Sequence, residues 1–299
     1  MGRALTTTFC ILCLYWQSGK RDRHVQRLAG LAATVVSNFS SIAALQMPLL
    51  HAGIVAPLLL CVETYNTALA PTESEEELGA GSEAKVMTAA AAAKEDSQLA
   101  VQALYCLSNL ASNHEAHPLL FPPPKGSEKW AADEWAGARP PLLDALLICC
   151  AEATIPQSPS QRYAILILFR LVGSSPRHVA LVGAQPQVLE RLIAVLDREQ
   201  TESHAVRLAI SLMAVLSMHP PNQRLMVCFH ENQGGSGDNS AGVVAQLLKL
   251  CHLETDTIEE EMIRRCAACM LANLAACPEA LKYFADAQVC CCHKSMHFN

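Results

Sequence analysis

The sequence predicts an all-α protein, a right-handed superhelix (α-solenoid) of about five helical repeats with three loop insertions. Three observations predict this fold. Hydrophobic residues make up 51% of the 299 residues, but aromatic residues only 5%, which is typical of helices packed through small and aliphatic side chains. Similar apolar segments recur along the chain. Polar, glycine-rich or proline-rich stretches separate them.

Five segments carry small and apolar residues at helical spacing. In the second segment, Leu99, Ala103 and Leu107 recur every four residues and therefore share one helix face. Each of the first four segments is followed by a short polar break and a further apolar helix, so we expect helices that pack on one another. The five segments are 25–40, 97–112, 160–174, 204–217 and 262–276, and the helices that follow the first four lie within 49–63, 139–153, 186–199 and 241–254.

The spacing of the segments predicts where the insertions lie. Equivalent residues of the five segments are 71, 62, 44 and 58 residues apart, so all but the shortest interval need extra chain. We expect one repeat domain over residues 1–290 and an irregular tail over 291–299, and the alanine run 89–93 favours extending the helix after it. The residues aligned are Asn38, Asn109, Leu171, Val215 and Asn273, and the three expected insertions are 64–96, 121–141 and 231–240.

Two segments carry a family resemblance. The segment AVQALYCLSNLAS resembles the third helix of an armadillo repeat, because its run of small and apolar residues leads to the Asn109–Leu110 pair near its end. LLHAGIVAPLLLCVE resembles the second helix of that repeat, with Gly53 at the preceding turn. The resemblance covers most of the chain outside the insertions. It is weaker in the third and fourth segments, where Leu171 and Val215 replace the asparagine, and these two segments also resemble HEAT repeats.

The armadillo resemblance implies a function. In that family the third helices line a concave groove that binds a peptide segment, so we expect a non-enzymatic protein–protein interaction scaffold or adaptor. An asparagine in the groove carries a donor and an acceptor, so it can hold an extended peptide backbone or hydrogen-bond the helix ends of its own repeat. The expected groove residues are Asn38, Tyr105, Asn109, Tyr163, Arg207, Arg265 and Asn273.

The groove residues also indicate the partner. Arg207 and Arg265 suit an acidic or phosphorylated protein segment. Nuclear-import adaptors of the family place a tryptophan one turn before each asparagine, and here only Tyr105 is aromatic at that position, which argues against that activity. The acidic segment 73–83 is a candidate internal mimic of the partner, and its deletion is then expected to tighten partner binding. The net charge of −6 argues against a nucleic-acid partner.

No catalytic or cofactor motif occurs in the chain, so we expect neither enzyme activity nor a cofactor. Many of the 14 cysteines lie inside apolar runs, as Cys106 does, and are interpreted as small buried hydrophobes of a protein of the cytosol or nucleus. The Cys10/Cys13 and Cys266/Cys269 pairs, and the cluster 290–293, lack a second paired loop, so no metal site is expected.

Two apolar stretches resemble membrane elements. Residues 42–62 are long enough to cross a bilayer, but Gly53 and two prolines interrupt them, which favours a helix, a turn and a helix of one repeat. Residues 4–16 resemble a signal-peptide core without a small-residue cleavage site, and residues 5–16 are interpreted as the second helix of an incomplete first repeat. That end belongs either to a fragment of a longer array or to a docking surface.

The N-terminus also supports an alternative function. MGRALT matches the myristoylation pattern with Gly2 as acceptor, and Cys10 and Cys13 could add palmitate. The chain would then be a lipid-anchored, membrane-associated armadillo adaptor. Whether residues 4–16 pack against the array distinguishes the two functions.

Overall fold

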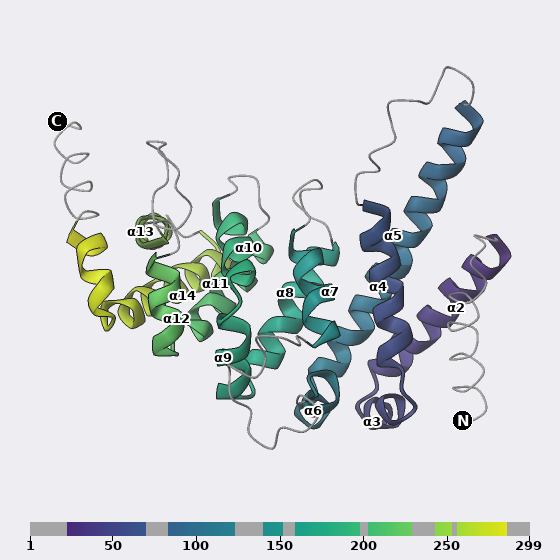
Figure 1. The fold of residues 1–299 in the computed structure, drawn as a ribbon, viewed down its shortest axis with the longest axis horizontal. Helices are drawn as coiled ribbons and strands as arrows, with labels where there is room; N and C mark the ends of the chain where they lie inside the picture. Colours follow the sequence, from purple (N-terminus) through teal and green to yellow (C-terminus); the bar gives the residue numbers. More distant parts are fainter. Residues whose placement is uncertain are drawn as a thin grey trace. The chain divides into compact units, whose positions relative to one another are not determined.

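The computed structural model describes the chain in seven stretches, and it divides the chain into two compact units. The first unit comprises residues 1–125 and 139–149, and the second comprises 126–138 and 150–299. All regular structure in the described stretches is helical, and they contain no strand. Figure 1 shows the helices of both units. The described stretches are 23–69, 83–122, 140–151, 159–197, 203–228, 243–252 and 256–285.

The first unit is built around two long helices. Its elements are α2 (Arg23–Ser40), α3 (Ala43–His51), α4 (Val55–Leu69), α5 (Glu83–Ala111), η2 (His114–Ala116), α6 (His117–Leu120) and the part of α7 (Pro141–Ala151) that ends at Cys149. Helix α5 packs against α2 on one side and α4 on another, and the short elements α3 and η2 contact each other. The long helix α5 therefore contacts another long helix, α2, and its neighbour along the chain, α4.

The second unit repeats this arrangement. Its elements are α8 (Pro159–Val172), α9 (Pro176–Gly183), α10 (Pro186–Asp197), α11 (Ser203–Leu216), α12 (Pro220–Cys228), α13 (Val243–Cys251), α14 (Ile258–Ala275) and η5 (Pro278–Ala280), followed by a helical turn at 281–285. The long helices pack in the order α8, α11, α14. Helix α10 contacts α13, and α9, α12 and η5 contact one another in that order. Each unit is thus a stack of layers, consistent with an α-solenoid.

The core consists of small and aliphatic side chains, as the composition predicts. Leu104 and Leu107 of α5 and Ile165 of α8 have no exposed surface, and neither does Cys106. Burial raises the pKa of the Cys106 thiol to about 12, so this side chain stays protonated and packs as a small hydrophobe. All the described cysteines are free, and Cys61, Cys149 and Cys150 are also buried, in agreement with the interpretation of these cysteines as small buried hydrophobes.

The five long segments and the four that follow them are helical, as predicted. The expected polar breaks, however, contain the short helices α6, α9 and α12, which the periodicity did not indicate. Proline begins α9 and α12, where its missing N–H would have no helical partner in any case. Ser175 caps α9 by accepting a hydrogen bond from the backbone N–H of Arg177 at 3.3 Å. These helices are too short for an amphipathic period to be recognised.

Residues 42–62 form helix, turn and helix, as predicted. Gly53 lies between α3 and α4 with φ at +80°, a conformation that glycine adopts without strain. Helices also extend into the segment 64–96, because α4 ends at Leu69 and α5 begins at Glu83 and includes the alanine run. Residues 70–82, the segment 231–240, most of 121–141 and the tail 291–299 lie outside the described residues.

Candidate functional site

The candidate groove residues lie on the long helices of both units. Asn38 on α2 and Tyr105 on α5 are exposed, whereas Asn109 on α5 is half-buried. In the second unit, α8 carries Tyr163, α11 carries Arg207, and α14 carries Arg265 and Asn273. The structure therefore groups the first three residues in one unit and the other four in the other.

Asn109 and Asn273 both join one long helix to the long helix before it. The Asn109 Nδ2 donates to the Ser40 hydroxyl at the end of α2, at 3.1 Å. The Asn273 Nδ2 donates to the Ser217 hydroxyl just beyond α11, at 2.9 Å. Each serine hydroxyl donates its own proton to a carbonyl three residues earlier, at 2.7 Å, so its oxygen can only accept from the asparagine. This geometry favours the structural role that the sequence left open beside peptide binding.

The acceptor half of each asparagine is not used in this contact. Among the described residues, no hydrogen bond reaches the Oδ1 atom of Asn109 or Asn273. The same side chain can therefore join two helices and offer an acceptor to a ligand N–H. Asn38 is exposed, and no described residue hydrogen-bonds its side chain.

A second set of polar side chains, outside the predicted groove residues, closes the turns after the long helices. Gln46 donates to the Ser40 carbonyl at 3.0 Å, and Gln223 donates to the Ser217 carbonyl at 2.8 Å. Two histidines reach the same kind of carbonyl, because His117 contacts Ala111 O at 2.8 Å and His178 contacts Leu171 O at 2.9 Å. The C-terminal carbonyls of a helix lack helical partners, so these side chains satisfy them. The sequence signal that could have revealed these contacts is a Gln or His six or seven residues after the end of a long helix.

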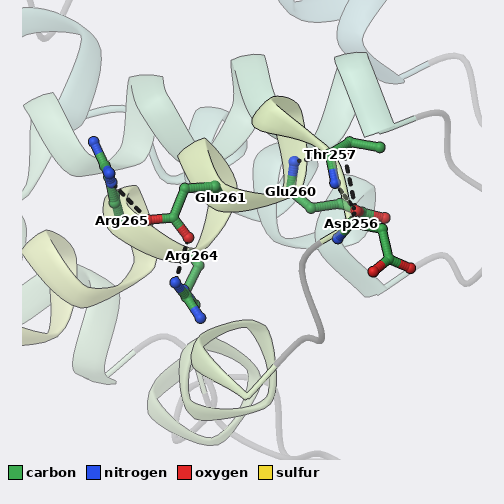
Figure 2. A network of polar contacts seen from close by, with 6 residues as sticks. All are labelled: Asp256, Thr257, Glu260, Glu261, Arg264 and Arg265. Carbon is green, nitrogen blue, oxygen red and sulfur yellow. Dashed lines mark hydrogen bonds and ion pairs between the residues drawn. The ribbon is translucent and has the colours of Figure 1, made fainter.

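Arg207 and Arg265 are both balanced by carboxylates of α14. Arg207 lies 4.0 Å from Glu259 and 2.7 Å from the Nδ1 of His204. Arg265 donates from its Nε to Glu261 at 2.8 Å, and Arg264 pairs with the other oxygen of that carboxylate (Figure 2). The hydrogen bond from Arg265 holds the pKa of Glu261 below its usual value, so this carboxylate is ionised at neutral pH. The sequence predicted the cations in the groove, but it did not predict that they pair with these carboxylates.

The first turn of α14 is closed by a capping box. The Thr257 hydroxyl accepts a hydrogen bond from the Glu260 N–H at 3.2 Å, and the Glu260 carboxylate accepts from the Thr257 N–H at 2.9 Å (Figure 2). The Asp256 N–H donates to the same carboxylate at 3.0 Å. The Thr257 hydroxyl also donates to this carboxylate at 2.9 Å, and this bond, followed by the two backbone bonds, lowers the pKa of Glu260. These bonds fix the end of α14 at which a candidate site lies.

An open pocket of about 540 Å³ lies beside this first turn of α14. Two apolar side chains on its wall are unusually exposed, since Ile258 shows 84% of its surface and Met262 shows 43%. The Arg265 side chain, 78% exposed, stands at the same pocket. The pocket therefore offers apolar surface, a cation and carboxylates together, and it is lined by Asp256, Thr257, Ile258, Glu261, Met262 and Arg265.

The described residues contain no cluster of three or more histidine, cysteine or acidic side chains that could hold a metal ion. Cys266 lies 3.5 Å from the Ser211 hydroxyl, and Cys269 is exposed on the same helix. The pair Cys10/Cys13 and the cluster 290–293 lie outside the described residues, as does Gly2.

No single helix within the described stretches is long and apolar enough to cross a membrane. Two pairs of helices pass on length and composition when taken together, and each pair is bent by 84°. One of them is α3 with α4, the segment predicted as helix, turn and helix.

No family model matches the chain, and no curated protein matches it. Among solved structures, 13 chains match. One is a crystal structure described as an engineered protein from the Northeast Structural Genomics Consortium. It is 19% identical to this chain, with a TM-score of 0.54, and the match covers 93% of this chain and 85% of that one. At this level of identity the likeness concerns the fold alone.

Proposed function

We propose that the protein is a non-enzymatic scaffold of the armadillo type, a right-handed superhelix of about five repeats that binds protein segments along its long helices. The pocket at the first turn of α14 carries this proposal. Solvent-exposed apolar side chains beside a cation are typical of surfaces that recognise peptides. The proposed working compartment is the cytosol or nucleus.

The ligand follows from the chemistry of the pocket. Ile258 and Met262 favour a segment with an apolar side chain at its centre. Glu261 already pairs with Arg265, so an acidic or phosphorylated residue of the segment would share this arginine with a carboxylate. We therefore propose that the ligand is a peptide segment with an apolar residue that binds the pocket and one anionic residue that sets the orientation of the segment. A strongly acidic segment is not expected.

Selection of peptides from a random library on the immobilised protein tests the proposal. Selected peptides are expected to bind at least ten-fold more weakly to Ile258→Asp and Met262→Asp, because each change replaces buried apolar contact with a charge. The two positions are exposed in the free protein, so the variants are expected to fold, and aspartate at position 258, the first residue of α14, suits the helix dipole.

Met218→Asp is the matched control. Met218 is 69% exposed in the turn after α11 and does not line the pocket. Affinity measured by fluorescence polarisation is expected to be unchanged in this variant. Equal binding of all the selected peptides to the control and both pocket variants would contradict the proposal, and so would a library that yields no binder. Arg265→Gln is expected to weaken only the peptides that carry an anionic residue.

A further inference from the structure

Helix α2 has an exposed apolar stripe. Leu28, Leu31 and Val35 show 49%, 66% and 40% of their surfaces. They are spaced by three and four residues and therefore lie on one face of the helix. We call these three residues the α2 stripe.

The corresponding positions of the later long helices are covered. Leu28, Leu31 and Val35 precede Asn38 by ten, seven and three residues. Their equivalents in the other long helices are the residues that precede the residue aligned with Asn38 by the same numbers. All four residues equivalent to Val35 are fully buried, and all four equivalent to Leu28 are buried. The equivalents of Leu31 are buried or half-buried. The equivalents are Leu99, Gln102 and Cys106 in α5, Gln161, Ala164 and Leu168 in α8, Ala205, Leu208 and Leu212 in α11, and Ile263, Cys266 and Met270 in α14.

The contacts of these equivalent residues show which helix this face packs against in the later repeats. In α5, Gln102 pairs with Thr34 of α2 at 3.1 Å, and the Cys106 thiol hydrogen-bonds to Ser40. In α14, Cys266 contacts Ser211 of α11. The face therefore packs against the preceding long helix, and no described helix precedes α2. Three neighbouring large hydrophobic side chains are left uncovered as a result.

Residues 4–16 have the composition and the position to cover this face. The segment ALTTTFCILCLYW contains no charged residue, and six residues, 17–22, separate it from α2. In the second unit, linkers of five and six residues let α10 and α13 pack on the long helices α11 and α14 that follow them, so a linker of six residues is long enough for residues 4–16 to reach α2. A tether of this length holds the segment near α2 at a high effective concentration, which favours it over any free partner.

We propose that residues 4–16 dock on the α2 stripe and cover the face that a preceding long helix covers in the later repeats. The chain thereby closes the exposed end of its own first unit. This surface is separate from the pocket on α14, and the proposal stands whether or not that pocket binds a peptide.

The fluorescence of Trp16 in the full chain tests the proposal. The chain has 3 tryptophans, and replacing Trp130 and Trp135 by phenylalanine leaves Trp16 as the reporter. We expect blue-shifted emission that acrylamide quenches weakly. Leu31→Asp is expected to shift the emission to the red and to raise the quenching constant several-fold, because a charge at the centre of the stripe repels an apolar segment.

Leu225→Asp, an exposed leucine of α12 at 39%, is the matched control and is expected to leave Trp16 unchanged. Leu31→Met is expected to keep the emission of the parent chain. Emission that is already red-shifted in the parent, or equal in Leu31→Asp and the control, would overturn the proposal.

Two further measurements exclude the other occupants of the stripe. Sedimentation that shows a dimer in the parent and a monomer in Leu31→Asp would assign the stripe to a second copy of the chain. Trp16 that becomes buried only when vesicles of phosphatidylcholine and phosphatidylserine are added would assign residues 4–16 to a membrane. Either result would overturn the intramolecular docking, which predicts a monomer that is protected without lipid.

Discussion

At the residue scale, two of the asparagines that the sequence predicts in the groove, Asn109 and Asn273, link neighbouring helices. Asn109 and Asn273 occupy equivalent positions and make the same contact to a serine, although 164 residues separate them. Asn38 occupies the same position in α2, where no described helix precedes it. The asparagine at this position therefore makes a contact with the preceding helix in α5 and α14, and its side chain is exposed in α2.

This difference provides an internally controlled prediction. Asn109→Ala is expected to lower the free energy of unfolding by about 1 kcal/mol, because it removes the hydrogen bond from the amide to the Ser40 hydroxyl. Asn38→Ala is expected to change it by less than about 0.5 kcal/mol, as is usual for exposed positions. Urea unfolding followed by circular dichroism measures both. Equal losses in the two variants would show that the contact to Ser40 does not stabilise the stack.

His178 supplies a prediction about pH. The ring is buried and donates from Nδ1 to the Leu171 carbonyl at 2.9 Å, and burial lowers its pKa. The unfolded chain therefore takes up this proton at a higher pH than the folded chain. The stability that the neutral ring provides is present above pH about 6.5 and is lost as the pH falls below that value.

In His178→Gln this part of the pH dependence is expected to disappear. Glutamine can still donate to the carbonyl, as Gln46 and Gln223 do after α2 and α11. Urea midpoints measured between pH 7.5 and 5 should fall less steeply in the variant than in the parent. Parallel curves would show that another group controls stability over this range.

At the scale of single elements, long helices were predictable and short ones were not. Helix α8 shows a clear apolar period, so its existence follows from the sequence. Helix α12 has nine residues and few apolar ones, and it forms because Asn222 and Gln223 bond to the end of α11 and Met226 is buried. Tertiary contacts therefore create the short helices, and no local pattern reports them.

Gly183 shows the same dependence on tertiary contact. A Cβ atom at this position would lie 2.0 Å from the Nδ2 of Asn222, which donates to the carbonyls of Val179 and Leu216 at 3.1 and 3.0 Å. The glycine is needed because α9 and α12 approach closely, and the local conformation of α9 does not require it.

The capping box of α14 yields the prediction at this scale. Thr257→Ala is expected to destabilise the protein by about 1 kcal/mol, because the Glu260 N–H loses its acceptor at the start of the helix. Thr257→Ser retains a hydroxyl and is expected to stay within about 0.5 kcal/mol of the parent. Urea unfolding compares the three proteins. A serine variant as unstable as the alanine variant would contradict the capping role.

At the scale of the whole molecule, each unit is a stack in which a helix meets its neighbours along the chain. In such stacks stability is the sum of local terms and nearest-neighbour contacts. A lost contact should therefore weaken the helices that shared it more than distant ones. The structure provides two equivalent contacts, one in each unit, with which to test this.

Hydrogen exchange measured by mass spectrometry is the readout. Asn109→Ala is expected to accelerate exchange in α2 and α5 and to leave α11 and α14 nearly unchanged, and Asn273→Ala is expected to do the reverse. Equal acceleration in both units by either variant would show that the chain unfolds as one cooperative body.

The sequence by itself determined the helical class, the five long helices, the helix, turn and helix at 42–62, and the burial of most described cysteines. These follow from apolar periodicity and from where glycine and proline occur, which are local properties. Tertiary structure alone decided what the polar residues of the candidate groove do. Asn109 donates to Ser40, and Arg265 pairs with Glu261. Tertiary structure likewise decided that the apolar Leu31 stays exposed. The reason is physical, because a side chain's partner depends on which helix lies opposite it, and spacing along one helix carries no information about the neighbouring one.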